Sequence, residues 1–181
     1  MHLVEKTVSS KDIFNGRIIR VKEDKAQLEN GDIVTREAVL HPGGVCIVPI
    51  NENGEVLMVK QFRYPFQRPL LEIPAGKLEY GEDHFTCGKR ELKEEIGAEA
   101  DSFVYLGCMY PSPAYLSEII HIYMASGLNY SSQKLDDDEF LDIVRLPLDK
   151  AVSMVLSNDI KDGKTKLALL MAERILRAGK Q

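Results

Sequence analysis

The sequence predicts an α+β fold in which helices flank a mixed sheet, preceded by a small N-terminal β unit. Three observations predict it. The first forty residues carry a hairpin signal, several later segments read as short apolar strands, and three segments have helical spacing. With 44% hydrophobic and 28% charged residues, the 181-residue chain has the composition of a folded globular protein.

The N-terminal β unit is predicted from residues 14–39. Two extended stretches lie on either side of Asn30-Gly31, a dipeptide favoured in tight hairpin turns. The sequence His-Pro-Gly-Gly at 41–44 then interrupts the chain. We therefore expect two domains, with residues 1–42 forming the β unit and residues 43–181 forming the main body.

The main body is predicted to begin with a buried strand at 45–50, where the chain reads VCIVPI. Residues 70–83 are expected to form a loop, because they include Pro74, Gly76 and Gly81. The other expected strands are 55–64, 103–110, 119–128 and 140–148, and the expected helices are 83–96, 148–156 and 164–177.

Charge and composition exclude several classes of protein. A net charge of -5 gives no general attraction to nucleic acid or anionic membranes, so a bound phosphate group would need a cation. No apolar run approaches the ~20 residues of a membrane span, and residues 1–10 lack the apolar segment of a signal peptide. We expect a cytoplasmic protein without nucleic-acid or membrane partners.

The helix expected at 83–96 combines an apolar face with an acidic one. Phe85, Leu92 and Ile96 share the apolar face, while Glu91 and Glu95 lie one turn apart beside it. Like charges at this spacing destabilise an isolated helix by about 0.2–0.5 kcal/mol. A positive group is therefore expected near them.

Two positive groups could compensate these carboxylates. Arg90 and Lys93 could do so on a solvent-facing helix with many ion pairs. Alternatively, the carboxylates could hold Mg²⁺ or Mn²⁺, which prefer hard oxygen ligands on a rigid backbone.

Residues 76–98 resemble the Nudix box, G-x5-E-x7-R-E-U-x-E-E-x-G-U, in which U is aliphatic. Seven fixed positions are in register, and they would match by chance at roughly 10⁻⁸ per start site. Leu92 fills the first aliphatic position, and Ala98 stands where a larger aliphatic residue is usual. The fixed positions are Gly76, Glu82, Arg90, Glu91, Glu94, Glu95 and Gly97.

The resemblance implies an α/β/α sandwich around a mixed sheet and assigns roles within the box. It implies that the metal ligands are Glu91, Glu94, Glu95 and the backbone carbonyl of Ala75, with Glu82 as a further ligand or a close neighbour. Arg90 would hold the carboxylates as a structural partner.

Sequences on both sides of the box resemble ADP-ribose pyrophosphatases: QFRYPFQRPLLEIPAGKLE before it and YPSPAYLSEIIHIYMASGL after it. The resemblance implies that Arg63 contacts a phosphate or the terminal ribose, although an ion pair with Glu72 is the alternative. Glu118 would contact ribose hydroxyls, with Ser112 in the same loop. The residues expected to reach the adenine from a partner subunit are Arg36, Glu37 and Phe14.

The acidic run at 136–139 precedes a predicted strand. Such runs are usually solvated loops, but in the resembled family this loop can supply the general base. Glu139 is the first candidate and Asp137 the second.

The function implied by the resemblance is hydrolysis of ADP-ribose to AMP and ribose 5-phosphate, with Mg²⁺ or Mn²⁺ as cofactor. Another nucleoside diphosphate sugar such as GDP-mannose, a dinucleotide, or a non-hydrolysing ADP-ribose-binding regulator remain open alternatives. A β unit of about forty residues buries little apolar surface alone, and the resembled family exchanges such units. We therefore expect a homodimer with exchanged N-terminal units.

Overall fold

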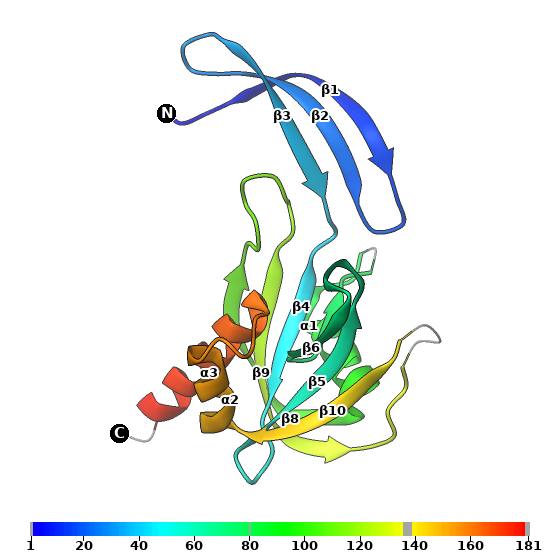
Figure 1. Cartoon of the computed structure of the whole chain (residues 1–181), viewed down its shortest axis with the longest axis vertical. Helices are drawn as coiled ribbons and strands as arrows, with labels where there is room; N and C mark the ends of the chain where they lie inside the picture. Colours follow the sequence, from blue (N-terminus) through cyan, green and yellow to red (C-terminus); the bar gives the residue numbers. More distant parts are fainter. Residues whose placement is uncertain (1, 80, 136–138, 180–181) are drawn as a thin grey trace. The chain divides into compact units, whose positions relative to one another are not determined.

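The computed structural model describes residues 2–79, 81–135 and 139–179. Internal contacts divide the chain into two units (Figure 1). One comprises Met1–Gly43 and Tyr110–Ile119, and the other comprises Gly44–Met109 and Ile120–Gln181. The inclusion of Tyr110–Ile119 in the N-terminal unit was not expected from the sequence.

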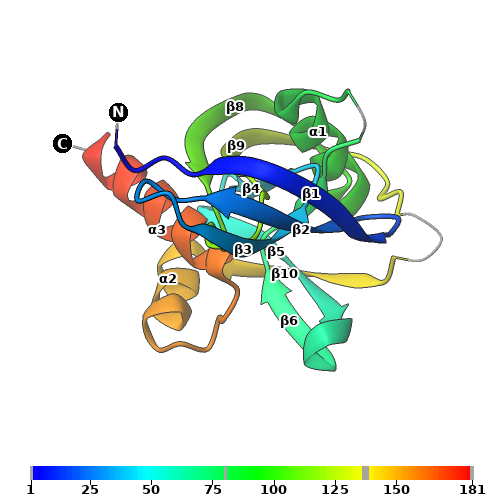
Figure 2. The ribbon, with the colours of Figure 1, turned by 90° about the horizontal axis from the view of Figure 1, so that it is seen from above.

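The N-terminal unit is a three-stranded antiparallel sheet in the order β1-β2-β3, whose strands lie side by side in Figure 2. The strands are β1 (Lys6–Asn15), β2 (Arg20–Gln27) and β3 (Ile33–Leu40). The turn at Asn30-Gly31 joins β2 to β3 as expected, with Gly31 at φ +91°. The sequence did not predict β1, because this strand is largely polar and exposed throughout.

The main unit contains the mixed sheet that the sequence predicts and a second, antiparallel sheet. The first is mixed, in the order β7-β4-β9-β8, with β4 and β9 parallel and the other pairs antiparallel. The second is antiparallel, in the order β10-β5-β6, and the short helix η1 (Tyr64–Phe66) joins β5 to β6. The strands are β4 (Gly44–Pro49), β5 (Glu55–Arg63), β6 (Arg68–Glu72), β7 (Ala75–Lys77), β8 (Ala98–Met109), β9 (Ile120–Tyr130) and β10 (Leu141–Pro147).

The loop expected at 70–83 was partly wrong. It contains the end of β6 and all of β7, which lie on either side of Pro74. A strand as short as the three residues of β7 carries too little alternation to be recognised beside Pro74 and Gly76. Its pairing with β4 holds Ala75 and Gly76 against the buried sheet.

The first helix begins and ends where the sequence predicts. The Asp83 side chain accepts hydrogen bonds from the backbone N–H groups of Phe85 and Thr86, and Gly97 ends the helix at φ +68°. The apolar face is only partly buried, because Phe85 is 42% exposed. The helices are α1 (His84–Glu91), continued by the π-helical turn η2 (Leu92–Ile96), then α2 (Leu148–Leu156) and α3 (Gly163–Ala178).

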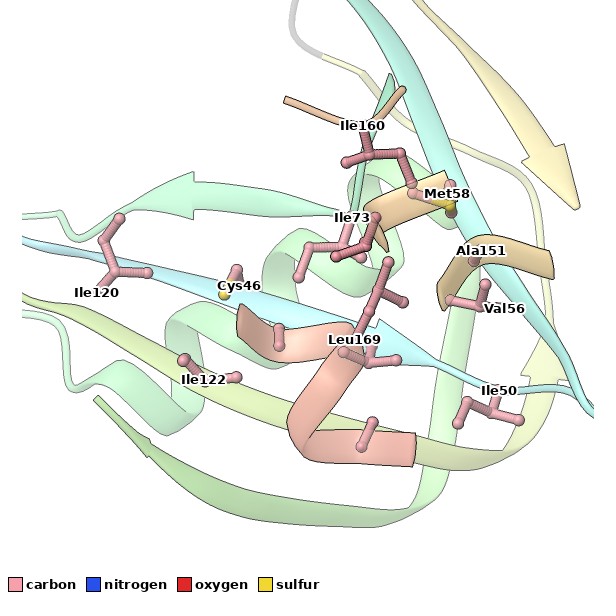
Figure 3. Close-up of a cluster of buried hydrophobic side chains, with 14 residues drawn as sticks. Cys46, Ile50, Val56, Met58, Ile73, Ile120, Ile122, Ala151, Ile160 and Leu169 are labelled. Carbon is pink, nitrogen blue, oxygen red and sulfur yellow. The ribbon is translucent and has the colours of Figure 1, made fainter. Parts of the chain in front are cut away.

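Alternate residues of β4 face two separate cores. Val45 and Ile47 belong to the cluster that includes Leu92 and Ile96, on the side of α1 and η2. Cys46 belongs to the opposite cluster, which α3 covers through Ala168, Leu169 and Ala172 (Figure 3). The mixed sheet therefore has helices on both faces, as the sequence predicts.

None of the described helices is long and apolar enough to cross a membrane.

Candidate active site

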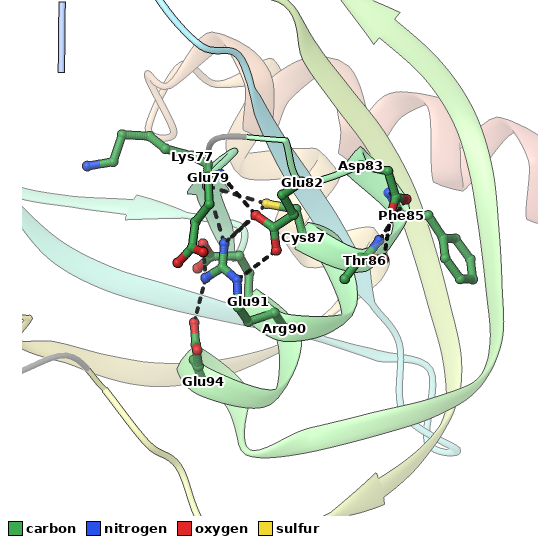
Figure 4. A network of polar contacts seen from close by, with 10 residues as sticks. All are labelled: Lys77, Glu79, Glu82, Asp83, Phe85, Thr86, Cys87, Arg90, Glu91 and Glu94. Carbon is green, nitrogen blue, oxygen red and sulfur yellow. Dashed lines mark hydrogen bonds and ion pairs between the residues drawn. The ribbon is translucent and has the colours of Figure 1, made fainter.

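Arg90 lies among three carboxylates of the acidic segment (Figure 4). Its Nε and Nη2 donate to the two oxygens of Glu82 at 2.9 and 3.1 Å. Its Nη1 donates at 2.8 Å both to Glu91 Oε1 and to Glu94 Oε2. These contacts raise the pKa of Arg90, and its hydrogen bonds lower the pKa of Glu82.

Lys93 does not join this group. Its ammonium instead binds Glu99 Oε1 at 2.7 Å, and both side chains are more than half exposed. The sequence left both Arg90 and Lys93 as possible partners of the box carboxylates. Within the described part of the chain, Arg90 contacts these carboxylates and Lys93 does not.

Glu91 and Glu95 are buried, at 7% and 2% exposure. Burial, together with the negative charge of neighbouring carboxylates, raises the pKa of Glu91 to about 7 and that of Glu95 to about 8. Glu95 Oε2 accepts a hydrogen bond of 3.1 Å from the backbone N–H of Ala75. Arg90 therefore does not fully offset the effects of burial and mutual repulsion on these two carboxylates.

Gly76 leaves the room that the Glu91 carboxylate occupies. A Cβ added at Gly76 would lie 1.7 Å from Glu91 Oε1, far inside any real contact distance. The sequence therefore places a residue without a side chain where β7 passes the acidic helix.

The donors at this site fit a hard divalent cation. Three carboxylates, from Glu82, Glu91 and Glu94, contact the single guanidinium of Arg90, and the charge of Glu91 reaches the fourth, Glu95. Within the described ranges, no three His, Cys, Asp or Glu side chains converge on a common metal position. The ligand roles expected for Ala75 and the four glutamates stay a prediction.

Arg63, at the end of β5, forms the ion pair that the sequence left as an alternative. Its Nε and Nη2 each donate at 2.8 Å to one oxygen of Glu72, which is 1% exposed. Glu72 also receives the ammonium of Lys164, from the start of α3. The sequence gave no signal for Lys164, because this residue is 92 positions from Glu72.

The negative charge of Glu139 contributes to the raised pKa values of both Glu91 and Glu95. Glu139 also lines a cavity of about 430 Å³, together with Lys60, Phe62, Pro69, Leu135, Phe140, Leu141 and Asp142. Asp137, the second candidate base, lies outside the described residues.

The remaining candidate residues lie in the N-terminal unit. Arg36 binds both oxygens of Glu5 at 2.9 and 2.7 Å, while Glu37 is exposed on β3. Phe14 is 54% exposed. Glu118 Oε1 lies 3.5 Å from His41 Nδ1, and the carbonyl of Ser112 accepts from the backbone N–H of Leu116 at 3.0 Å.

Two family models together cover most of the chain. Residues 40–169 match the NUDIX domain. Residues 5–39 match the nucleoside diphosphate sugar hydrolase N-terminal domain.

Several characterised proteins are similar over most of their length. A methanol dehydrogenase activator of Bacillus methanolicus is 41% identical over 91% of this chain and 90% of its own. An ADP-ribose pyrophosphatase of Bacillus subtilis is 38% identical over 98% of both chains. A GDP-mannose pyrophosphatase of Yersinia enterocolitica is 36% identical over 80% of this chain and 82% of its own.

A solved structure shares the fold. The crystal structure of an ADP compounds hydrolase superimposes with a TM-score of 0.88, covering 99% of this chain and 97% of that one. The two sequences are 23% identical, so this likeness supports the architecture alone.

Proposed function

Because the chain belongs to the Nudix family of hydrolases, we propose that it hydrolyses the diphosphate bridge of ADP-ribose to AMP and ribose 5-phosphate. The observation that carries this proposal is the 38% identity, over 98% of both chains, with an ADP-ribose pyrophosphatase. It is supported by the complete acidic segment, in which Glu82, Glu91 and Glu94 lie against Arg90.

A divalent cation, Mg²⁺ or Mn²⁺, is the proposed cofactor. When bound, such an ion neutralises diphosphate charge and lowers the pKa of a bound water. The residues that would hold it are the box glutamates and the carbonyl of Ala75. Arg90 limits the repulsion among these carboxylates, and the hydrogen bond from Ala75 orients the Glu95 carboxylate.

Two further residues are proposed to act on the substrate. Arg63 would bind phosphate oxygens through a guanidinium that remains charged at all relevant pH values. Glu139 would accept a proton from the attacking water, which adds to phosphorus as the P–O bond of the bridge breaks. The cavity beside Glu139 leaves room for part of the substrate.

The N-terminal unit is proposed to pair with that of a second copy, giving a homodimer with composite sites. Its apolar side chains are exposed, with Val8 at 58%, Ile13 at 53% and Ile33 at 53%. Among the described residues of β1 to β3, Ala26 is the single apolar residue that is buried. Light scattering at micromolar concentration should give the mass of a dimer, and a monomer would contradict it.

GDP-mannose is the second candidate substrate, because a GDP-mannose pyrophosphatase is 36% identical over 80% of this chain. A regulator that binds ADP-ribose without cleaving it is disfavoured, since no carboxylate of the box is missing.

A hydrolysis panel tests the proposal. ADP-ribose, GDP-mannose, other nucleotide sugars and dinucleotides are incubated with Mg²⁺ or Mn²⁺, and the products are identified by mass. ADP-ribose should have the highest kcat/KM and yield AMP and ribose 5-phosphate. A higher kcat/KM for GDP-mannose would reassign the substrate, and no turnover of any compound would contradict the proposal.

A further inference from the structure

We propose that Lys164 is a positioning residue for substrate binding, which acts on Arg63 through the buried carboxylate of Glu72. The inference rests on the proposed function, in which Arg63 binds a phosphate of the substrate. If the inference holds, α3 influences the affinity for the diphosphate although it lies outside the acidic segment.

Glu72 lies between two cations. One side of the Arg63 guanidinium, Nε and Nη2, binds both of its oxygens at 2.8 Å. The ammonium of Lys164 binds the oxygen that also receives Arg63 Nη2. The side chain of Glu72 is 2% exposed and that of Lys164 is 13% exposed, so water screens this arrangement little.

The start of α3 fixes Lys164 in place. Asp162 caps the helix by accepting from the backbone N–H of Thr165 at 2.9 Å, and it contacts Lys164 Nζ at 3.0 Å. The Thr165 hydroxyl in turn accepts at 3.0 Å from the N–H of Ile73, which follows Glu72 directly. The first turn of α3 therefore positions Lys164 through Asp162 and the chain next to Glu72 through Thr165.

The remaining donors of Arg63 are available for an anion. A guanidinium carries five N–H groups, and the two contacts to Glu72 leave Nη1 without a partner among the described residues. The Arg63 side chain is 36% exposed, in contrast to the other members of the group. The Glu72 contact therefore orients the guanidinium and leaves its Nη1 edge open.

Lys164 shares the charge of Glu72. The charges of Asp162 and Glu72 outweigh burial and raise the pKa of Lys164, so its ammonium stays protonated. Without that ammonium, Glu72 would pair with Arg63 alone, and the pair would attract a phosphate less strongly. Lys164 is thus expected to change affinity for the diphosphate without touching it.

A double-mutant cycle tests the inference. Lys164→Met is made in the wild-type and Arg63→Ala backgrounds, with Lys164→Arg as the conservative variant. Lys161→Met is the matched control, because it removes the same charge from an exposed position just before α3. Each protein is measured for the KM and kcat of ADP-ribose and for the Kd of inorganic pyrophosphate with Mg²⁺ by calorimetry.

Lys164→Met should raise the KM and the pyrophosphate Kd about tenfold in the wild-type background, the size expected for one misplaced charge-assisted hydrogen bond. It should change neither in the Arg63→Ala background, because coupled residues are not additive. Lys164→Arg should recover most of the affinity, and Lys161→Met should retain it.

The same loss in both backgrounds, or a lower melting temperature with unchanged KM and Kd, would overturn the inference. Wild-type turnover of ADP-ribose reports separately on the proposed function. The pyrophosphate measurement needs no turnover, so failure of one proposal is distinguishable from failure of the other.

Discussion

The carboxylate of Glu91 fills the space where a side chain on Gly76 would begin, since a Cβ there would lie 1.7 Å from Glu91 Oε1. The strand β7 and the helix α1 can approach this closely only because residue 76 is glycine. The position of Glu91 in the acidic group therefore depends on a residue that makes no polar side-chain contact of its own.

Gly76→Ala should reduce kcat more than it reduces stability. The new methyl group must displace the buried Glu91 carboxylate, which would cost about 1–3 kcal/mol as an overpacked site. With Glu91 displaced, kcat for ADP-ribose should fall about 100-fold or more, because small errors of position weaken catalysis strongly. Steady-state kinetics and urea unfolding measure both effects.

Gly163→Ala is the matched control. Nothing lies within 4 Å of a Cβ added at this first residue of α3. The variant should keep the wild-type kcat and gain about 0.5–1 kcal/mol in the free energy of unfolding. Full activity in Gly76→Ala would show that the proximity of Gly76 to Glu91 has no functional role.

Arg90→Met should destabilise the protein, because three carboxylates would lose a shared partner. The side chain of Arg90 is 27% exposed, so we expect a loss of about 2 kcal/mol, below the value for a fully buried pair. Mg²⁺ should raise the melting temperature more in this variant than in the wild type, since the ion would supply the missing positive charge. Thermal unfolding with and without Mg²⁺ measures this difference.

Lys93→Met removes a neighbouring charge whose ion-pair partner among the described residues, Glu99, is exposed. It should change the free energy of unfolding by less than about 1 kcal/mol. An Arg90→Met protein as stable as Lys93→Met would contradict the central position given to Arg90.

Removal of the divalent cation should abolish turnover and lower the melting temperature. An ion that binds only the folded protein stabilises it by about 2.7 kcal/mol at one hundred times its Kd. EDTA titration followed by Mg²⁺ addition, with activity and thermal unfolding measured at each step, checks both effects. Unchanged activity and melting temperature in EDTA would exclude the proposed cation site.

The sequence predicted the acidic segment well, because its residues lie within one helix and the loop before it. Asp83 and Gly97 carry their own capping chemistry, so the ends of this helix were also predictable. The Arg63, Glu72 and Lys164 group was not predictable as a whole, because it depends on contacts between the start of α3 and the end of β6. Likewise, β1 has no apolar alternation, and only its pairing with β2 makes it a strand.

Glu72 should make stability depend on acid pH. Burial alone would raise its pKa, but hydrogen bonds and charges from Arg63 and Lys164 outweigh burial and lower it below the ordinary 4.5. A lowered pKa in the folded state stabilises the protein above the unfolded pKa, and this contribution is lost as pH falls through the folded value. The advantage of wild type over Glu72→Gln should therefore be full at pH 7 and shrink below pH ~4.5.

Urea unfolding of both proteins between pH 7 and pH 3 measures this difference. The exposed Glu52→Gln serves as control and should follow the wild type over the whole range. If wild type and Glu72→Gln differed by a constant amount at every pH, the ion pairs of Glu72 would not be the source of the stability.

Glu139→Gln should lower kcat by about 10²–10⁴-fold with a smaller change in KM, as expected for loss of a positioned general base. Glu139 is the first candidate, and its charge reaches both Glu91 and Glu95, around which the cation is proposed to bind. Asp137→Asn, made in parallel, separates the two candidates by kcat at saturating Mg²⁺ and ADP-ribose. A loss of that size in Asp137→Asn, with Glu139→Gln near wild type, would move the role of the base to Asp137.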